Sequence, residues 1–77
     1  MEDLLEYLAK ALVDSPEDVS VESFEEDDGT VVLELHVAQD DVGKVIGRSG
    51  RTVNALRTVV RASAVKQGRR VLVDVVD

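Results

Sequence analysis

The stretch that decides the fold reads Val42-Gly43-Lys44-Val45-Ile46-Gly47-Arg48-Ser49-Gly50-Arg51-Thr52-Val53, residues 42–53 of a 77-residue chain. Gly47 and Gly50 enclose two residues, and glycine allows the backbone to turn sharply and another chain to come close to it. Arg48 places a positive charge between the two glycines. The stretch therefore predicts a tight basic turn between two helices, and we expect the function of the protein to reside there.

Helix signals lie on both sides of this turn. Asp40 and Asp41 are suited to cap a short helix over residues 42–46, which Gly47 ends. A longer helix is expected from about residue 50 to residue 67, with Gly68 as its C-cap. The apolar stripe of this helix consists of Val53, Leu56, Val60 and Ala64, widened by Ala55, Val59 and Ala62.

The N-terminal half predicts a helix and a hairpin. Apolar residues recur at helical spacing at Leu4, Leu5, Leu8, Ala11 and Leu12, and Asp14-Ser15-Pro16 ends that helix. A strand over residues 19–24 is followed by an acidic turn, residues 25–29, whose Asp-Gly pair is a hairpin signal. In the next strand, one face consists of Val31, Leu33, Leu35 and Val37.

These elements predict an α+β fold with the order α-β-β-α-α-β. The hairpin makes the first two strands antiparallel, whereas the helical crossover makes the second strand parallel to a last strand over residues 71–76. We expect a three-stranded mixed sheet with three helices on one face. The other face would expose Val32, Leu72 and Val76 as a modest apolar stripe that is a candidate partner surface.

Composition limits the class of protein. With 77 residues and no cysteine, the chain is expected to form one domain without disulfides or thiolate metal sites. Hydrophobic residues make up 44% of the chain and charged residues 32%, as in a folded soluble domain. The sequence contains no run of eighteen apolar residues and no basic and apolar leader. We therefore expect neither membrane insertion nor secretion, and a cytoplasmic location.

The net charge of −7 is unevenly distributed along the chain. Residues 1–41 hold fourteen acids and one lysine, whereas residues 42–73 hold eight basic residues and no acid. Because phosphate binding depends on lysine and arginine, this segregation indicates a local positive surface that suits nucleic acid. The alternative is a basic helix that simply pairs with the acidic half.

No catalytic or metal-binding constellation is recognisable in the sequence. His36 would lie on the outer face of the second strand, without a cysteine or a second histidine to share a metal. The carboxylates occur in turns and on a helix face rather than as a pair in a cleft, and no nucleophile has a base at a recognisable spacing. We therefore expect no enzymatic activity, no metal and no cofactor.

The glycine spacing separates this turn from two other phosphate-binding motifs. Neither the Walker pattern GxxxxGK[ST] nor the dinucleotide fingerprint GxGxxG is present. Instead, Val45-Ile46-Gly47-Arg48-Ser49-Gly50 followed by Val53 resembles the VIGxxGxxI signature of KH domains, with valine in the last place. The order of elements resembles the type II KH fold over essentially the whole chain. The chain is thus similar to small bacterial proteins made of one KH domain, here residues 1–77 with the GxxG loop at residues 47–50.

The resemblance implies a protein that binds single-stranded RNA as a homodimer, in post-transcriptional regulation or as an RNA chaperone. It also implies association with a larger KH-containing RNA-binding protein. The residues expected to contact RNA are Val42, Gly43, Lys44, Val45, Ile46, Gly47, Arg48, Ser49, Gly50, Arg51 and Thr52. Among them, Lys44, Arg48 and Arg51 would supply charge, and the backbone amides near residues 51 and 52 would attract phosphates.

The same stretch predicts how a binding groove would be lined. Val42, Val45 and Ile46 would form an apolar wall for bases, in a chain with only 3% aromatic residues. The opposite wall would come from the second strand and from the acidic turn at residues 25–28, which would keep the affinity for RNA low. The alternative function is a protein-interaction module that recruits the larger KH-containing partner, with RNA binding incidental. Arg48 favours RNA binding, because a purely structural turn would not require a charge between its glycines.

Overall fold

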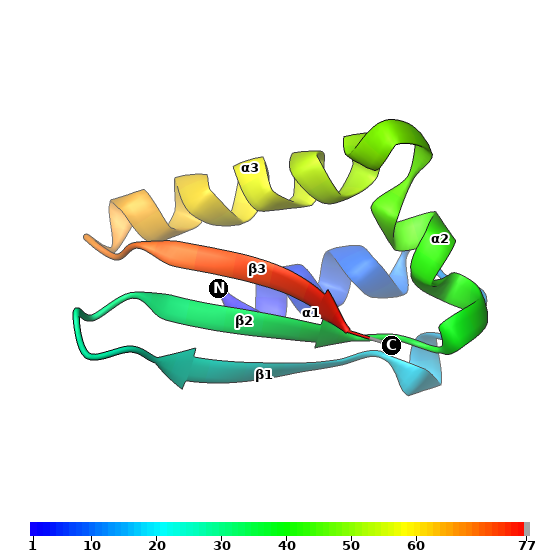
Figure 1. The fold of residues 1–77 in the computed structure, drawn as a ribbon, viewed down its shortest axis with the longest axis horizontal. Helices are drawn as coiled ribbons and strands as arrows, with labels where there is room; N and C mark the ends of the chain where they lie inside the picture. The colour runs from blue at the N-terminus through cyan, green and yellow to red at the C-terminus, as the bar shows by residue number, and fades with distance from the viewer. Residues whose placement is uncertain (77) are drawn as a thin grey trace.

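The alternating strand of the N-terminal half is the centre of the sheet. In the computed structural model, which describes residues 1–76, β2 (Val31–His36) lies between β1 (Ser20–Glu25) and β3 (Val71–Val76) (Figure 1). β1 pairs with β2 antiparallel, and β2 pairs with β3 parallel. Along β2, inward residues are buried and outward residues are half-buried, as a period of two requires for a sheet with one covered face. The predicted three-stranded mixed sheet is confirmed.

The helices cover one side of this sheet. α1 (Glu2–Lys10) and α3 (Arg51–Lys66) lie over one face, and the short α2 (Val42–Ile46) lies at the end of the sheet (Figure 1). The side chains buried between the layers are Leu5, Ala9, Val19, Val31, Leu33, Leu35, Val37, Val45, Leu56, Val60, Ala64, Val71 and Val73. Aliphatic and mostly β-branched side chains therefore form the core. The predicted order α-β-β-α-α-β is confirmed.

The two long helices bury narrower stripes than their sequences suggest. α1 ends at Lys10, several residues before the predicted stop at Pro16, so Ala11 and Leu12 lie beyond the helix and are exposed. On α3 the predicted stripe is buried, but the residues expected to widen it are not, because only one side of this helix faces the sheet. The resulting apolar hollow between α1 and α3 has a volume of about 290 Å³ and is lined by Leu8, Ala11, Leu12, Thr52, Ala55, Leu56 and Val59. We call this surface the α1–α3 hollow.

The hairpin between β1 and β2 has a longer loop than a two-residue Asp-Gly turn. The Glu26 N–H donates to the Thr30 carbonyl at 2.8 Å, and Gly29 has a positive φ of 87°. The Asp28 carboxylate accepts a hydrogen bond from the Thr30 N–H at 2.9 Å. This bond, together with the nearby Arg70, holds the pKa of Asp28 below its usual value of 3.8. The predicted hairpin is confirmed, with a local aspartate turn that organises its tip.

Within residues 1–76 the helices are all too short or too polar to cross a lipid bilayer.

Candidate nucleic-acid interface

The GxxG turn (residues 47–50) joins α2 to α3 through a sequence of unusual backbone conformations. Gly47 has φ 75° and ψ 173°, and Gly50 has φ 75° and ψ 14°. Ser49 also lies in the left-handed region, with φ 56° and ψ 27°. Two hydrogen bonds close the turn: Gly47 N–H donates to Gly43 O at 2.9 Å, and Gly50 N–H donates to Gly47 O at 3.2 Å. The backbone is thereby folded into a compact projection at one end of the molecule (Figure 1).

The glycine at residue 47 is required by the neighbouring helix. A Cβ atom built on Gly47 would lie 2.2 Å from Thr52 Oγ1 and 2.9 Å from the Thr52 backbone nitrogen. The first turn of α3 therefore packs directly on this glycine. At Gly50 the nearest atom to such a Cβ is 3.8 Å away, so the positive φ, rather than crowding, favours glycine there. From the sequence alone, both glycines are explained by a sharp turn and by the close approach of another chain. At Gly47, the structure shows that the segment in close approach is the start of α3 in the same chain.

The start of α3 follows this turn directly, and its first amide is used within the turn, because the Arg51 N–H donates to the Arg48 carbonyl. Gly50 is its N-cap, and no side chain caps the helix. The first N–H groups of an α-helix have no partner within the helix, and they carry a partial positive charge. Arg51 begins the helix with an exposed guanidinium, and Thr52 is half-buried beneath Gly47. The amides that follow Arg51 and the Arg51 guanidinium are thus the groups that the start of α3 can offer to an anion.

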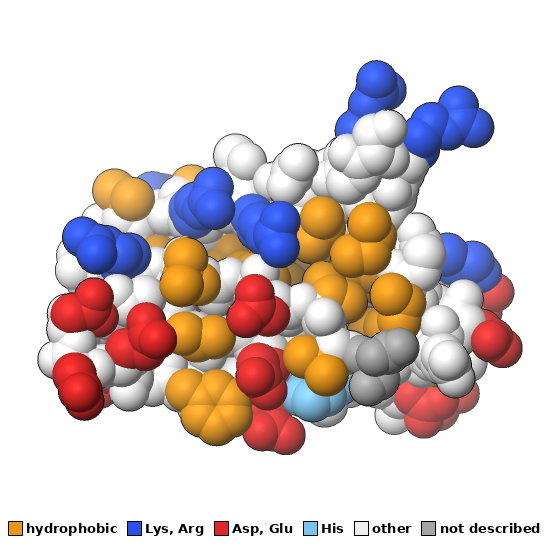
Figure 2. Space-filling model, viewed as in Figure 1, with side chains coloured by type: hydrophobic (Ala, Val, Ile, Leu, Met, Phe, Trp, Pro, Cys, Tyr) orange, Lys and Arg blue, Asp and Glu red, His pale blue; other side chains and the backbone are white. Residues whose placement is uncertain are grey.

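The three basic residues assigned to the site differ in their surroundings. Arg48 and Arg51 are exposed and form no ion pair with any residue in 1–76. Lys44 instead pairs with the Asp14 carboxylate, and its Nζ lies 3.9 Å from Asp41 Oδ1. The hydrogen bond to Asp14 raises the pKa of Lys44 above its usual value of 10.5. Of the three basic residues, Arg48 and Arg51 are therefore the ones whose charge is available to bind a phosphate. Figure 2 shows basic side chains that project from this turn.

The predicted capping role of Asp41 is wrong. Asp41 does precede α2, but it makes no side-chain cap bond to that helix. Its carboxylate is 2% exposed and accepts hydrogen bonds from the Asp14 N–H at 3.2 Å and the Ser15 N–H at 3.0 Å. These donors belong to the segment after α1, so the two hydrogen bonds of Asp41 connect that distant segment to the start of α2.

The predicted apolar wall also needs correction. Val45 is fully buried and belongs to the core, because the face of α2 that carries it lies against the sheet. Val42 and Ile46 remain half-exposed. Of the three residues predicted to form the wall, only these two are accessible at the surface, and Val45 instead anchors α2 to the core.

The strand with a free backbone edge beside α2 is β3, whereas the second strand, which was predicted to line the groove, lies in the centre of the sheet. β2 is paired on both sides, so its backbone has no free edge, whereas β3 is an edge strand in contact with α2 and α3. The Arg70 carbonyl accepts a hydrogen bond from the Val31 N–H at 2.9 Å, at the start of the pairing between β2 and β3. Along β3, the backbone N–H and C=O groups therefore point alternately toward β2 and toward the free edge. At that edge, Val73 O accepts a hydrogen bond from Arg57 Nε at 3.1 Å. Arg57 thus links α3 to the free edge of β3, a placement that the sequence did not indicate.

The acidic hairpin tip is partly neutralised by the end of the basic segment. Arg69 Nη2 lies 2.5 Å from Glu25 Oε1, and Arg70 Nη1 lies 3.9 Å from Asp28 Oδ2. Pairing between the basic and acidic halves therefore does occur, but at the hairpin and at Lys44 rather than at the GxxG turn. Figure 2 shows the result: hydrophobic side chains gather between α2 and β3, with basic side chains above them and acidic ones at the hairpin end.

Comparison with known proteins gives consistent matches over the whole chain. Residues 2–75 match the family model described as KhpA/KhpB, KH domain. RNA-binding protein KhpA of Halalkalibacterium halodurans is 55% identical over 78 residues, which cover 100% of both chains. RNA-binding protein KhpA of Streptomyces coelicolor is 54% identical over 77 residues, which cover 100% of this chain and 92% of the relative.

A solved structure shares the fold at lower identity. The crystal structure of Era in complex with MgGDPNP and nucleotides 1506–1542 of 16S ribosomal RNA superposes with a TM-score of 0.65. The match covers 96% of this chain and 28% of Era, at 18% sequence identity. At that identity, the likeness shows the arrangement of helices and strands alone.

Proposed function

Because this chain belongs to the KhpA/KhpB family of KH domains, we propose that it binds single-stranded RNA by clamping the RNA backbone at the GxxG turn. The observation that carries the proposal is the position of Arg48 and Arg51. Both are exposed cations without an ion pair in residues 1–76, and they flank an uncapped helix start. In a protein of net charge −7, two neighbouring exposed arginines form a local positive patch that suits binding to a polyanion.

The turn would hold the phosphates and the groove would hold the bases. KH loops clamp about four nucleotides by their backbone. The amides at the start of α3 would donate to one phosphate, and Arg48 and Arg51 would contact its neighbours. Bases would then lie on Val42 and Ile46, facing the free backbone edge of β3. Since no aromatic side chain lies on these elements, base recognition would rest on apolar contact and backbone hydrogen bonds, and sequence preference would be low.

The small number of cations fixes the salt dependence. For single strands, log K falls with log salt by about 0.7 for each phosphate contact. Two or three contacts therefore give a slope of roughly −1.4 to −2.1. One domain would bind weakly at physiological salt, and a second copy would raise the affinity by increasing the effective concentration of binding sites.

The α1–α3 hollow supports a homodimer. Leu12 and Val59, which line it, are 40% and 45% exposed, and apolar surface of this kind marks interaction sites. No residue of β3 lines the hollow, so a second copy bound there would leave the free edge of that strand uncovered. Sedimentation of Val59→Lys tests this arrangement: a monomer with unchanged circular dichroism supports it, whereas an unchanged dimer contradicts it.

The same hollow favours the second candidate function, a module that recruits a larger KH-containing protein. In that case Val59→Lys would abolish partner binding, and changes in the GxxG turn would have no effect in cells. In the RNA-binding function, both changes matter, and the protein acts in the cytoplasm in post-transcriptional regulation or as an RNA chaperone. We assign no catalytic step to it.

The decisive experiment reverses the charge of the turn. In Arg48→Asp with Ser49→Asp, both sites are exposed, and aspartate tolerates the left-handed conformation that Ser49 adopts. One hydrogen bond to a charged group is worth about 1.5–3 kcal/mol. Filter binding to a labelled single-stranded RNA should therefore weaken by more than about tenfold, with unchanged circular dichroism.

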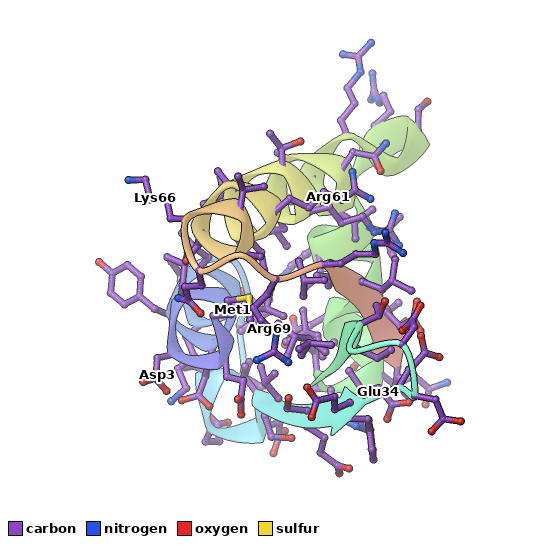
Figure 3. All side chains as sticks on the ribbon, turned by 90° about the vertical axis from the view of Figure 1, so that its left-hand side faces the viewer. Met1, Asp3, Glu34, Arg61, Lys66 and Arg69 are labelled. Atoms are coloured by element: carbon purple, nitrogen blue, oxygen red, sulfur yellow. The ribbon has the colours of Figure 1, made fainter. Side chains whose placement is uncertain are left out.

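A matched control carries the same charge change at the far end of α3. Lys66→Asp with Gln67→Asp alters two exposed, adjacent positions, and Figure 3 shows Lys66 away from the turn. This control should keep most of its RNA affinity. Equal loss in both variants would show that only overall charge matters, and retained binding in the turn variant would refute the proposed site.

A further inference from the structure

A histidine and two glutamates meet on the outer face of the sheet, which α1 and α3 do not cover. Glu22 on β1 and Glu34 on β2 are direct partners across the antiparallel ladder. His36 follows Glu34 by two residues and so shares its face. Figure 3 shows Glu34 on the side of the sheet away from α1 and α3, and Figure 2 shows the histidine, in pale blue, beside acidic side chains.

The imidazole of His36 points between the two carboxylates without bonding to either. Its Nε2 lies 3.7 Å from Glu22 Oε1 and 3.7 Å from Glu34 Oε1. Both distances exceed the range of an N–H···O hydrogen bond, about 2.7–3.2 Å. The His36 side chain is 32% exposed, yet Nε2 itself is shielded from solvent and has no hydrogen-bond partner among residues 1–76. A buried polar atom without a partner requires an explanation.

The spacing of the donor atoms matches that around a metal ion. One ligand atom from each of Glu22, Glu34 and His36 lies within 4.8 Å of the other two. With metal–ligand bonds of about 2.1 Å, neighbouring ligands of a tetrahedral ion are about 3.4 Å apart. The two distances to Nε2 are within a few tenths of an ångström of that value. Glu22 is 61% exposed, so its carboxylate is free to adjust the remaining distance.

Charge on this face favours a cation as well. Asp74 on β3 is the register partner of Glu34, so Glu22, Glu34 and Asp74 form a row of carboxylates across the three strands. Like charges directly opposite each other across a sheet destabilise it. A divalent ion held by two of them and by His36 would remove this repulsion and give Nε2 a partner.

We propose that Glu22, Glu34 and His36 form a binding site for Zn²⁺ or a similar transition-metal ion. One imidazole nitrogen and two carboxylate oxygens are ligands that Zn²⁺ accepts, whereas Mg²⁺ and Ca²⁺ prefer oxygen alone. Three protein ligands leave at least one coordination position for water or for a group of a partner molecule. The ion would link the edge strand β1 to β2 on the outer face of the sheet, and none of its ligands belongs to the GxxG turn, so the site is independent of the proposed RNA function.

The test uses untagged protein and ZnCl₂. Calorimetry should show one equivalent bound, and the NMR signals of the His36 ring should shift as Zn²⁺ is added. Glu22→Gln keeps the shape of an exposed side chain but removes one ligand charge, and it should lose this binding. Glu26→Gln is the matched control, because Glu26 is an exposed acid of the same hairpin that lies outside the cluster.

Thermal unfolding supplies a second measurement. A ligand that binds only the folded state raises the melting temperature, so Zn²⁺ should stabilise the unchanged protein and Glu26→Gln but not Glu22→Gln. Excess MgCl₂ should not displace Zn²⁺, and Glu22→Gln should keep its RNA affinity. If the His36 signals do not respond to Zn²⁺, or if Glu22→Gln binds Zn²⁺ as tightly as the unchanged protein, the proposed site is wrong.

Discussion

Replacing the glycines of the α2–α3 region one at a time should produce three different effects on stability. Gly47→Ala places a methyl group 2.2 Å from Thr52 Oγ1, 2.7 Å from Thr52 Cβ and 2.9 Å from the Thr52 nitrogen. Two of these atoms are fixed to the backbone of α3, so the clash cannot be relieved by a side-chain rotation. The dihedral angles of Gly47 also lie in a region that is essentially restricted to glycine, which costs about 1–3 kcal/mol.

The magnitudes follow from these contacts. Gly47→Ala should lower the free energy of unfolding by about 3 kcal/mol or more, the sum of backbone strain and a clash with α3. Gly50→Ala meets no atom closer than 3.8 Å, so it should cost only the left-handed conformation, about 1–2 kcal/mol. Gly43→Ala lies within α2 with nothing within 4 Å of the new methyl group, and it should stabilise by up to about 1 kcal/mol.

Urea unfolding followed by circular dichroism measures this series. A domain of this size has about 4–12 kcal/mol of stability, so Gly43→Ala and Gly50→Ala are expected to fold and Gly47→Ala to unfold at a much lower urea concentration. In the double variant Gly47→Ala with Thr52→Ala, the clash with Oγ1 disappears but those with Cβ and the backbone nitrogen remain, so only part of the stability should return. Equal unfolding midpoints for Gly47→Ala and Gly50→Ala would refute the packing of α3 on Gly47.

Three further predictions concern single side chains. Asp41→Ala leaves the N–H groups of Asp14 and Ser15 without their acceptor and should lower the free energy of unfolding in urea by about 2 kcal/mol or more. Asp41→Asn keeps one acceptor oxygen and should lower it less. Equal losses would contradict the role of the carboxylate. Val45→Ala removes buried core volume and should lower the free energy of unfolding by about 2 kcal/mol, while the folded variant keeps its RNA affinity. Ile46→Ala should instead weaken RNA binding with little loss of stability. The reverse pattern would place Val45 in the groove. The pKa of the Asp28 carboxyl should lie below 3.8 in an NMR titration, because its ionised form accepts the Thr30 N–H. The stabilising contribution of this carboxylate is therefore present above the unfolded-state pKa and is lost as the pH falls through the folded-state pKa. Thr30→Pro removes that N–H and should bring the pKa of Asp28 back toward 3.8.

Local patterns were enough to predict the elements that position the site. The alternation of Val31, Leu33 and Leu35 identified the central strand, because a strand with one covered face must alternate. Gly68 marked the end of α3, and it adopts the positive φ of 69° expected for a C-cap glycine. These features depend on near neighbours in the chain, which is why the sequence reveals them.

The corrected features depend on contacts between distant segments. Asp41 resembles a helix cap in sequence, but its hydrogen-bond donors are Asp14 and Ser15, more than twenty-five residues earlier. α2 has only five residues, so its own pattern cannot decide whether Val45 or Ile46 faces the core. The cluster of Glu22 with Glu34 requires the register of the hairpin, which the turn sequence alone does not specify.

The predicted role of the second strand as a groove wall conflicts with its place in the sheet. The predicted pairing, with the second strand antiparallel to the first and parallel to the third, already places the second strand in the centre of the sheet. A strand paired on both sides has no free backbone groups to offer a ligand. The free edge belongs to the third strand, and the hydrogen bond of Arg57 to that edge is visible only in the structure.

Mapping RNA contacts on the ¹⁵N-labelled protein tests the central claim most directly. As a single-stranded RNA oligonucleotide is added, the backbone amide signals of residues 46–53 and of β3 should shift together and saturate. The amides around Lys66 and those of β1 should remain in place. Shifts confined to the α1–α3 hollow or to the outer face of the sheet, with no response at the GxxG turn, would contradict the account.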